Sequence, residues 1–466
     1  MDFADFILQH QGEDLASLAL SRDRLKEQVA DFDLALTTLE VRSKLRTKVP
    51  SWFALPSLRY PFRVSGEQCS SEETAEYKAK VAMSAVCGAS DYAKTGKNAL
   101  CEEPRYSALR KNGQKCVTPS TIADLTGGLG VDSWAFARHF DRVLYNEMQP
   151  ELARAAEHNF KVLGVDNVQV KCRELVPGNV AAVLDGFEPN VIFMDPARRA
   201  EDGRKVFRLE DCQPDVLKLL PELLDAAPKL LLKLSPMADI SLICKQLACV
   251  REVHVVASGG ECKELLLVLE RGYEGEHLTV IYENGSVLCL DQVQPGTQNS
   301  LDQVQPGTQN SVDQVQPGTQ SSWTRSTGGQ WPEGSSLCVG QVLFEPGKAM
   351  LKAGAFELPC RYGLRKLGRH THYYTGMVPE ELKPFGKCFE ILEVRPFNNK
   401  TIKDFGKRYP LASVTARNIP LTSDQLRKKL GVKDGGSVHI FGLHADEDKL
   451  NLLLVCSEAG TPGTKP

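Results

Sequence analysis

Between residues 121 and 270, short apolar runs alternate with stretches whose apolar residues recur at helical spacing. Runs of four to six apolar residues bounded by polar residues or glycine are typical of buried strands. The predicted strands cover residues 121–125, 142–147, 191–194, 230–234, 253–257 and 265–269. Alternation of strand and helix, with two strands together at the end, predicts a doubly wound α/β sheet.

The chain on either side of this region has other patterns. Residues 1–100 read as helical, with apolar positions at helical spacing in 14–20 and 34–41. Ser70 or Ser71 should cap a further helix that has acidic residues in its first turn. Downstream, strands are expected at 278–283, 337–344, 389–394, 412–415 and 437–443, and helices at 346–355, 402–409 and 423–430.

Residues 291–323 form a tandem repeat of three near-identical 11-residue copies that begin DQVQPGTQ. The copies are rich in Gln, Pro, Gly and Ser, so they lack the apolar surface needed to fold alone, and they are too short for a solenoid repeat. We interpret them as a disordered surface insert without function. A binding role for the repeats is the alternative.

The clearest chemical signal is DLTGGLGVD, residues 124–132. A strand that opens through glycines into a helix lets a ligand approach bare backbone at the positive end of that helix. The spacing is not G-x-G-x-x-G, which disfavours a dinucleotide-binding fold. It resembles the first motif of class I S-adenosylmethionine (SAM) methyltransferases. That resemblance implies SAM as the cofactor and a binding set of Asp124, Thr126, Gly127, Gly128, Gly130 and Asp132, with Asp124 or Asp132 near the ligand's ammonium group.

Glu147 closes the second predicted strand. An acidic side chain at that strand tip can accept both hydroxyls of a ribose, so Glu147 joins the cofactor-binding set. The alternative is a solvated residue at a strand end.

Asp195 and Pro196 follow the buried run 191–194. Pro196 biases Asp195 toward an extended backbone and thereby holds its carboxylate in place. The segment resembles the D/N-P-P-[YFWR] motif of nucleic-acid methyltransferases, whose acidic residue orients the acceptor atom. Ala197 stands in place of the second proline and Arg198 in place of the aromatic that stacks on a flipped base, which weakens the case for an exocyclic amine as acceptor.

The candidate catalytic residues are Asp195, Pro196 and Arg198. Arg198 and Arg199 suit either a substrate phosphate or ion pairs within the fold. Cys212 and Cys262 lie in loop-like stretches, so either thiol remains a candidate for the nucleophile that methylation of pyrimidine carbon 5 requires.

Further motifs extend the resemblance to nearly the whole chain apart from the insert: EQCSSEETA (67–75), LEDCQPDV (209–216), KLSPMADI (233–240) and GECKEL (260–265). Together the motifs resemble a bacterial methyltransferase family with ferredoxin-like and THUMP-like domains after the catalytic domain. The resemblance implies four parts: a helical region (1–100), a Rossmann-like class I methyltransferase domain (101–272), a ferredoxin-like domain (273–386) and a THUMP-like domain (387–466). EQCSSEETA either contributes to the site or forms a capped helix that packs on the sheet.

Composition excludes several classes of protein. A chain of 466 residues with 42% apolar and 25% charged residues is typical of a globular protein with more than one domain. It has no signal-peptide pattern and no apolar run of the ~20 residues that a membrane helix needs. The 14 cysteines include no C-x-x-C pair and the nine histidines are dispersed, so no metal site or disulfide framework is predicted. We expect reduced thiols and a cytoplasmic location.

Residues 361–433 are strongly basic, with 16 Lys plus Arg against six Asp plus Glu. Their balance of +10 leaves −13 for the rest of a chain whose net charge is −3. Such asymmetry indicates phosphate contact and predicts RNA as the partner. Several aromatic or basic side chains could stack on unpaired bases: Arg365, Lys366, Arg369, His370, His372, Tyr373 and Tyr374. The alternative is a solvated basic face.

These signals favour a SAM-dependent methyltransferase that acts on a nitrogen or carbon of structured RNA, either tRNA or rRNA. Two other hypotheses remain: a non-catalytic RNA-binding protein on a methyltransferase scaffold, and a methyltransferase of small molecules. No membrane partner and no metal is predicted.

Overall fold

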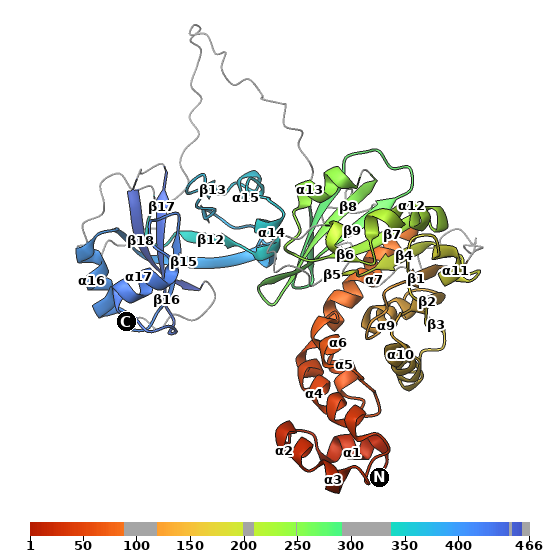
Figure 1. The fold of residues 1–466 in the computed structure, drawn as a ribbon. Coiled ribbons are helices and arrows are strands. Elements are labelled where there is room, and N and C mark those ends of the chain that lie inside the picture. Colours follow the sequence, from red (N-terminus) through yellow and green to blue (C-terminus); the bar gives the residue numbers. More distant parts are fainter. Residues whose placement is uncertain (88–118, 199–208, 248, 291–336, 447–449, 459–466) are drawn as a thin grey trace. The chain divides into compact units, whose positions relative to one another are not determined.

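The computed structural model describes residues 1–87, 119–198, 209–247, 249–290, 337–446 and 450–458 (Figure 1). The chain divides into two compact units, each treated by itself below. Unit 1 comprises Met1–Asp291 with Gly347–Ala355, and unit 2 comprises Gln292–Pro346 with Phe356–Pro466. The predicted insert 291–323 lies outside the described residues.

The amino-terminal part of unit 1 is helical, as the pattern predicts. Its helices are α1 (Phe3–Gln9), α2 (Leu15–Leu20), α3 (Arg22–Leu25), α4 (Phe32–Lys48), α5 (Pro50–Phe53), α6 (Arg63–Gln68) and α7 (Glu72–Cys87). Asp14 and Asp31 cap α2 and α4 by accepting hydrogen bonds from backbone N–H groups in the first turn. The first four helices enclose a small core around Phe6 and Phe32.

The later helices of this region share the core of the sheet. Trp52 of α5 lies edge-on to Trp134, with 5.9 Å between ring centroids. Asn159 binds the backbone of Arg59 through both ends of its amide, at 2.8 and 2.9 Å. Helix α7 contacts the central strands, and Figure 1 shows it leading from the column of amino-terminal helices to the sheet. The helical region therefore forms one wall of unit 1.

The sheet of unit 1 has nine strands in the order β11-β10-β8-β9-β7-β4-β1-β2-β3. The strands are β1 (Thr121–Asp124), β2 (Arg142–Asn146), β3 (Val168–Lys171), β4 (Val191–Met194), β7 (Lys229–Leu234), β8 (Val250–Ser258), β9 (Glu261–Glu270), β10 (Leu278–Glu283) and β11 (Ser286–Leu290). The five from β3 to β7 are parallel, and β9 runs antiparallel between β7 and β8. The predicted doubly wound α/β sheet is confirmed.

Helices connect the parallel strands: α9 (Val131–Ala137), α10 (Pro150–Val162), α11 (Val180–Leu184), α12 (Val216–Ala226) and α13 (Ile240–Gln246). Strand β1 lies between β4 and β2, so the chain winds outward from it in both directions. Ligands bind at the carboxyl ends of the strands beside such a switch point. The topology therefore places the glycine turn after β1, Glu147 after β2 and Asp195 after β4 at one edge.

One predicted boundary differs from the structure. Residues 278–290, expected in the ferredoxin-like part, form β10 and β11 of the unit 1 sheet, where β10 runs parallel to β8. Helix α14 (Lys348–Lys352) also belongs to unit 1 and packs on β8, β9 and β10. The apolar pattern predicts the strand 278–283 correctly, but such a pattern does not say which sheet a strand joins.

Unit 2 is built on a seven-stranded sheet in the order β13-β14-β12-β15-β18-β17-β16. Its strands are β12 (Val342–Pro346), β13 (Arg365–Lys366), β14 (Tyr374–Thr375), β15 (Gly386–Pro396), β16 (Ser413–Arg417), β17 (His439–Ala445) and β18 (Leu450–Glu458). Its helices are α15 (Leu358–Arg361), η2 (Lys383–Phe385), α16 (Asn399–Arg408) and α17 (Ser423–Leu430). Because β12 pairs with β15, one sheet runs through both predicted carboxyl-terminal domains.

Candidate functional site

The turn after β1 can be formed only by small residues. An added Cβ at Gly127 would lie 2.1 Å from the ring of Tyr145 on β2. Gly128 and Gly130 have φ angles of +54° and +92°, which side chains disfavour. The Tyr145 hydroxyl donates to the Gly128 carbonyl at 2.6 Å and holds the turn against β2.

On its other side, no described part of the chain packs against the turn. Apart from the carbonyl of Thr126 at 3.9 Å, no atom of the described residues outside the chain neighbours lies within 4 Å of an added Cβ at Gly128. A ligand can therefore reach the Gly128 backbone directly, which is the property that the sequence pattern predicts.

Glu147 lies beside this turn. Its Oε2 accepts a hydrogen bond from the Gly128 N–H at 2.9 Å, and its Oε1 accepts one from the Gln149 N–H at 2.9 Å. The residue is only 8% exposed, so its carboxylate is held in one place. Each oxygen keeps a second lone pair, which could accept a ribose hydroxyl.

Asp124 and Asp132, both predicted near the ligand, are bound by protein groups. Asp124 is buried and accepts hydrogen bonds from the Ser133 hydroxyl at 2.6 Å and the Thr126 N–H at 3.1 Å. Burial raises the pKa of Asp124 to about 8, so its carboxyl is largely protonated at neutral pH. Asp132 accepts from the Ser70 hydroxyl at 2.8 Å and pairs with Lys78 at 3.0 Å. Contact of either residue with a ligand ammonium stays a prediction.

Asp195 is tied to the glycine turn and to a lysine. Its backbone N–H donates to Thr126 Oγ1 at 2.7 Å, which links the residue after β4 to the turn after β1. Its carboxylate Oδ2 lies 2.6 Å from Nζ of Lys233 on β7. The side chain is 34% exposed, so it reaches solvent at the edge of the sheet.

Pro196 follows Asp195, and the next two residues form the short strand β5 (Ala197–Arg198). It pairs with β6 (Cys212–Gln213) and so fixes the backbone beyond Asp195. The side chain of Arg198, like all of Arg199, lies outside the described part of the chain.

A chain of ion pairs lies behind Asp195, and no sequence pattern predicts it. Lys78 of α7 is fully buried and pairs with Glu264 of β9 at 3.1 Å as well as with Asp132. Lys233 lies 3.8 Å from Glu264 and contacts Asp195. Burial opposes the charged form of Lys233, but these carboxylates outweigh it, so the net effect raises the pKa of Lys233.

This chain of ion pairs brings together residues from motifs that are far apart in the sequence. Ser70 belongs to EQCSSEETA, Lys78 to the helix α7 that begins within this motif, Asp132 to the glycine motif, Lys233 to KLSPMADI and Glu264 to GECKEL. The capped helix predicted for EQCSSEETA is present, since Ser71 accepts from the Thr74 N–H. Ser70 donates to Asp132, but a contribution of this motif to the site stays a prediction. A lysine inside an apolar strand pattern, as in LLLKL, is the signal that could have predicted a buried partner.

The two cysteines considered as nucleophiles are not activated. Cys212 is buried, and burial raises the pKa of its thiol to about 12. Burial likewise raises the pKa of the Cys262 thiol to about 11. A nucleophilic cysteine needs a lowered pKa to form the thiolate, so neither fits that role.

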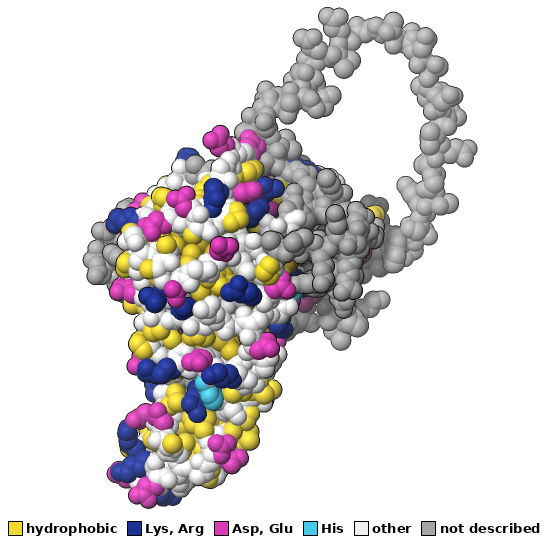
Figure 2. Space-filling view, turned by 90° about the vertical axis from the view of Figure 1, so that its right-hand side faces the viewer, with side chains coloured by type: hydrophobic (Ala, Val, Ile, Leu, Met, Phe, Trp, Pro, Cys, Tyr) yellow, Lys and Arg dark blue, Asp and Glu magenta, His cyan; other side chains and the backbone are white. Residues whose placement is uncertain are grey.

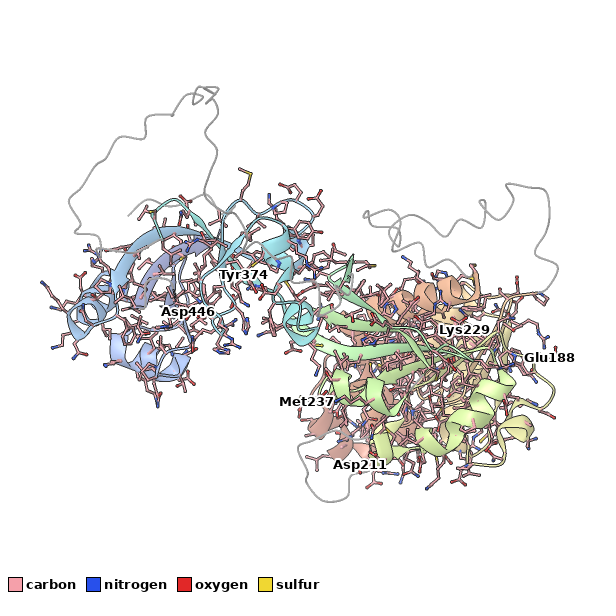
Figure 3. All side chains as sticks on the ribbon, turned by 90° about the horizontal axis from the view of Figure 1, so that it is seen from above. Glu188, Asp211, Lys229, Met237, Tyr374 and Asp446 are labelled. Atoms are coloured by element: carbon pink, nitrogen blue, oxygen red, sulfur yellow. The ribbon has the colours of Figure 1, made fainter. Side chains whose placement is uncertain are left out.

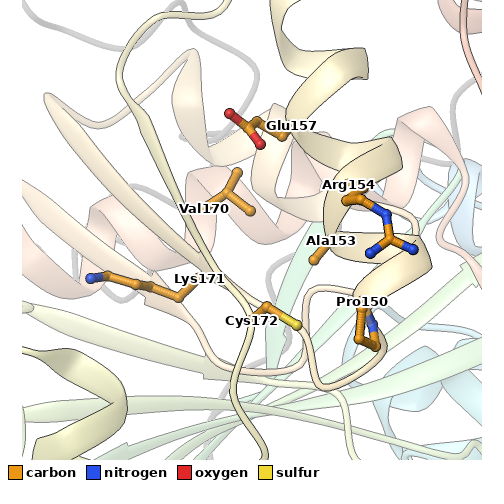
Figure 4. Close-up of a pocket in the computed structure, with 7 residues that line it drawn as sticks. All are labelled: Pro150, Ala153, Arg154, Glu157, Val170, Lys171 and Cys172. Carbon is orange, nitrogen blue, oxygen red and sulfur yellow. The ribbon is translucent and has the colours of Figure 1, made fainter.

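A surface pocket of about 220 Å³ lies between α10 and β3 (Figure 4). It is lined by Pro150, Ala153, Arg154, Glu157, Val170, Lys171 and Cys172. None of the predicted site residues lines it, although Pro150 follows Glu147 by three positions. We therefore place the candidate site at the strand edge around the glycine turn. The pocket is close to Glu147 in the sequence but shares no residue with the candidate site.

Over the described ranges, no group of three or more His, Cys, Asp or Glu side chains is arranged to hold a metal ion. Within the same residues, no helix combines the length and apolar character that spanning a membrane requires.

Some of the basic side chains in residues 361–433 form ion pairs, and others form none with the described residues. Arg417 pairs with Glu345, Arg408 with Glu393, and Arg427 with Asp424 at 2.7 Å. Six lysines on and beside α16 and α17 are exposed and make no ion pair with any described residue: Lys400, Lys403, Lys407, Lys428, Lys429 and Lys433.

The prediction that Tyr373 and Tyr374 could stack on unpaired bases is wrong. Tyr373 and Tyr374 are fully buried, and their hydroxyls donate to Glu345 and to the carbonyl of Phe356. His372 stacks on Phe356 with 4.0 Å between ring centroids. The two tyrosines are therefore core residues of unit 2 and cannot stack on bases.

Two known domain families match the carboxyl-terminal part of the chain. Residues 343–381 match a ferredoxin-like domain family, and residues 386–458 match a THUMP domain-like family. The tRNA/tmRNA (uracil-C(5))-methyltransferase of Photobacterium profundum is 29% identical over 133 residues. That match covers 23% of this chain and 36% of the relative, so the chain aligns with only about a third of the relative's length.

A solved structure resembles the chain almost from end to end. It is described as a "putative methyltransferase" from Porphyromonas gingivalis W83 and is 27% identical, with a TM-score of 0.69. The match covers 98% of this chain and 97% of that one. The resemblance read from the motifs is thus confirmed: the chain has the architecture of the methyltransferase family with ferredoxin-like and THUMP-like domains at the carboxyl end.

Proposed function

We propose that this protein is a SAM-dependent methyltransferase that acts on a nucleotide of structured RNA. The observation that carries the proposal is the junction of three strand ends. The Gly128 N–H binds Glu147, and the Asp195 N–H binds Thr126, so the ends of β1, β2 and β4 are joined at one edge. Cofactor and acceptor groups that bind at this edge would lie close together.

The residues at this edge fit SAM, which would supply an electrophilic methyl group. The open backbone at Gly128 would seat the methionine end of the cofactor. Glu147 would accept the ribose hydroxyls through its remaining lone pairs. Asp195, held extended by Pro196, would orient the acceptor atom or take its proton, and Arg198 would contact a substrate phosphate.

The RNA part of the proposal rests on unit 2. Six exposed lysines without ion pairs remain free to neutralise phosphates, which supplies most of the sequence-independent affinity for nucleic acid. The tRNA-modifying activity named for the Photobacterium relative supports RNA as the substrate class. The raised pKa values of the Cys212 and Cys262 thiols keep both protonated. Methylation of pyrimidine carbon 5 needs a thiolate, so an acceptor that is already nucleophilic is favoured.

The cofactor is tested first. We expect calorimetry to show saturable SAM binding in the micromolar range, weakened strongly by Gly128→Asp and Glu147→Ala. The matched control is Glu151→Ala, because Glu151 lies four positions further on, is exposed and, among the described residues, forms its ion pair with Arg154. Absence of binding to the unmodified protein would remove the enzyme hypothesis.

The substrate is tested with labelled SAM and total small and ribosomal RNA from a strain that lacks the gene. We expect label in one RNA species, lost with Asp195→Ala, while binding of SAM and RNA persists. Asp225→Ala, at an exposed position at the end of α12, serves as the control. RNA binding without any labelling would favour the non-catalytic scaffold, and labelling of small molecules alone would favour the third hypothesis.

A further inference from the structure

The geometry points to Lys233 as a positioning residue for methyl transfer, which acts through the carboxylate of Asp195. The inference rests on the proposed function and makes it more specific. Lys233 holds one oxygen of Asp195 and leaves the other to face the acceptor. Asp195 then orients the acceptor and does not take its proton.

Lys233 contacts Asp195 at short distance and through one of its two carboxylate oxygens. Lys233 Nζ lies 2.6 Å from Asp195 Oδ2, while Oδ1 has no hydrogen-bond partner among the residues that the structure describes. Asp195 is 34% exposed, so Oδ1 is open to a ligand. With its backbone N–H bound to Thr126, Asp195 is fixed at both ends.

Lys233 is itself held from behind. It stands near the carboxyl end of β7, with β4 on one side and β9 on the other, and its side chain is 13% exposed. Glu264 lies 3.8 Å away and is bound in turn by the buried Lys78, which also pairs with Asp132. Carboxylates and lysines therefore alternate from α9 to the site, and a shift of Lys233 would break this series.

The series contains one more carboxylate than lysine. Two lysines face three carboxylates, and the nearby Asp124 is largely protonated at neutral pH. Burying a charge is costly unless it is paired, so both lysines need the carboxylates on either side of them. Asp195 is the member of the series that reaches solvent.

This arrangement distinguishes between the two roles considered for Asp195. A cation in contact with a carboxylate stabilises its ionised form and makes it a weak base. When the acceptor's lone pair forms the new bond to carbon, the bond from carbon to sulfur breaks and its electron pair stays on sulfur. The acceptor gains positive charge, which Asp195 Oδ1 stabilises as a hydrogen-bond acceptor, and the proton then leaves to water.

The test uses the full-length protein with Lys233→Met, which removes the charge, and Lys233→Arg, which keeps it. Lys233→Gln keeps a donor without the charge and serves if the Met variant does not fold. The control is Lys229→Met on the same strand. Lys229 is 15% exposed and pairs with Glu270 at 3.3 Å. Figure 3 shows Lys229 well separated from Met237, which lies just beyond the carboxyl end of β7.

The first readout is the rate of label transfer to RNA at saturating SAM, measured against pH. We expect Lys233→Met to lower kcat by about tenfold to a hundredfold, because the acceptor is misplaced, while SAM affinity stays nearly unchanged. The acid limb of kcat should move to higher pH, because Asp195 is protonated more easily without the adjacent cation. Lys233→Arg should restore the acid limb, and Lys229→Met should leave it in place.

The titratable groups of the described residues that face Asp195 or Lys233 are Glu264, Asp132, Asp124, Lys48, Cys69 and Cys212, and none of them is altered in these variants. A shifted acid limb therefore reports on Lys233 alone. The inference is overturned if Lys233→Met keeps the wild-type profile. It is equally overturned if SAM affinity and transfer fall together and arginine restores neither, since that pattern marks a purely structural role.

A second readout does not need RNA. Titration of aspartate carboxyls by carbon-13 NMR, with the Asp195 signal assigned by its loss in Asp195→Asn, follows the ion pair directly. We expect the Asp195 titration to move to higher pH in Lys233→Met and not in Lys229→Met. If the wild-type protein labels no RNA, the proposed function fails, while this titration still decides whether Lys233 controls Asp195.

Discussion

The two units handle positive charge in opposite ways. In unit 1, Lys78 is fully buried and Lys233 is 13% exposed, and each lies within 4 Å of two carboxylates. In unit 2, six lysines on and beside α16 and α17 are exposed and carry no ion pair with a described residue. On the face of unit 1 seen in Figure 2, Lys and Arg are interspersed with Asp and Glu, so no large field of one sign covers that face.

The difference shows which charges can build a site and which can recruit a partner. A buried charge must be paired, and its pairing fixes the geometry of everything that it touches. An exposed lysine costs little, stays hydrated and remains available to a polyanion. Substitution of Lys78 or Lys233 should therefore change stability or chemistry, and substitution of the exposed lysines of unit 2 should change RNA affinity alone.

The largest effect on stability is expected from Lys78→Met. Removing the buried lysine takes the cation away from Asp132 and leaves Glu264 with Lys233 at 3.8 Å, which costs about 3–5 kcal/mol of unfolding free energy. The matched change is Lys80→Met, two residues further along α7. Lys80 is 33% exposed and pairs with Glu76 at 3.9 Å, so its loss should cost about 0.5 kcal/mol or less.

Urea unfolding of both variants makes the measurement. Equal and small losses would show that the series of buried charges contributes little, and the contrast between the units would no longer hold.

The next largest effect is expected from Gly127→Ala. The added methyl group would overlap the ring of Tyr145, which is buried and cannot retreat, so about 1–3 kcal/mol of stability should be lost. Because the turn is displaced, SAM affinity should fall by more than about tenfold, equivalent to 1.4 kcal/mol. Gly164→Ala is the control: its φ of +69° is strained for alanine, but an added Cβ would meet no atom within 4 Å among the described residues other than its chain neighbours. Calorimetry should show normal SAM binding for Gly164→Ala, and a normal affinity for Gly127→Ala would contradict the assignment of the turn.

Several segments of unit 1 and unit 2 show which features can be predicted from the sequence alone. Runs such as 191–194 and 230–234 predict the parallel strands because a strand buried on both faces must be apolar throughout. The turn of glycines after β1 and the position of Glu147 after β2 are predictable because both depend on local spacing within one short segment. Their roles in binding a cofactor stay predictions. Helix 423–430 is predicted with the bounds that the structure gives α17, since its cap and its final glycine are local signals.

What could not be predicted depends on pairing over long sequence distances. Lys78 and Glu264 are 186 positions apart, and no periodic pattern connects them. The strand at 278–283 was assigned to the wrong part for the same reason, since its partner β8 is not identified by its own pattern. Tyr373 and Tyr374 looked like a stacking surface because adjacent aromatics suit both a core and a ligand. Only the fold shows that both are buried.

A graded effect, spread over several pH units, is expected from Asp124. Burial raises its pKa from the usual 3.8 to about 8, so between these values the folded protein holds a proton that the unfolded chain has lost. The unfolding free energy should therefore fall as pH rises across this window, with a contribution of about 1.4 kcal/mol per pH unit from this residue. Asp124→Asn cannot titrate, so its stability relative to wild type should increase from pH 5 to pH 8. Parallel urea curves for the two proteins over that range would show that the carboxyl does not carry the proton.

The smallest effect on stability, and the sharpest on binding, is expected in unit 2. Lys428 and Lys429 are exposed and unpaired, so changing both to Ala should alter the unfolding free energy by no more than about 0.5 kcal/mol. Arg427, the next residue on α17, already pairs with Asp424, and Arg427→Gln should weaken RNA binding less.

The measurement is RNA affinity as a function of salt. Each lysine that contacts a phosphate adds about one unit to the slope of log affinity against log salt, so the double variant should lose up to about two units. SAM binding should not change, because Lys428 and Lys429 belong to unit 2 and the glycine turn belongs to unit 1. If the slope stays the same while affinity falls, the lysines act on the fold of unit 2. If neither changes, the basic face is only solvated, and RNA must be bound through another surface.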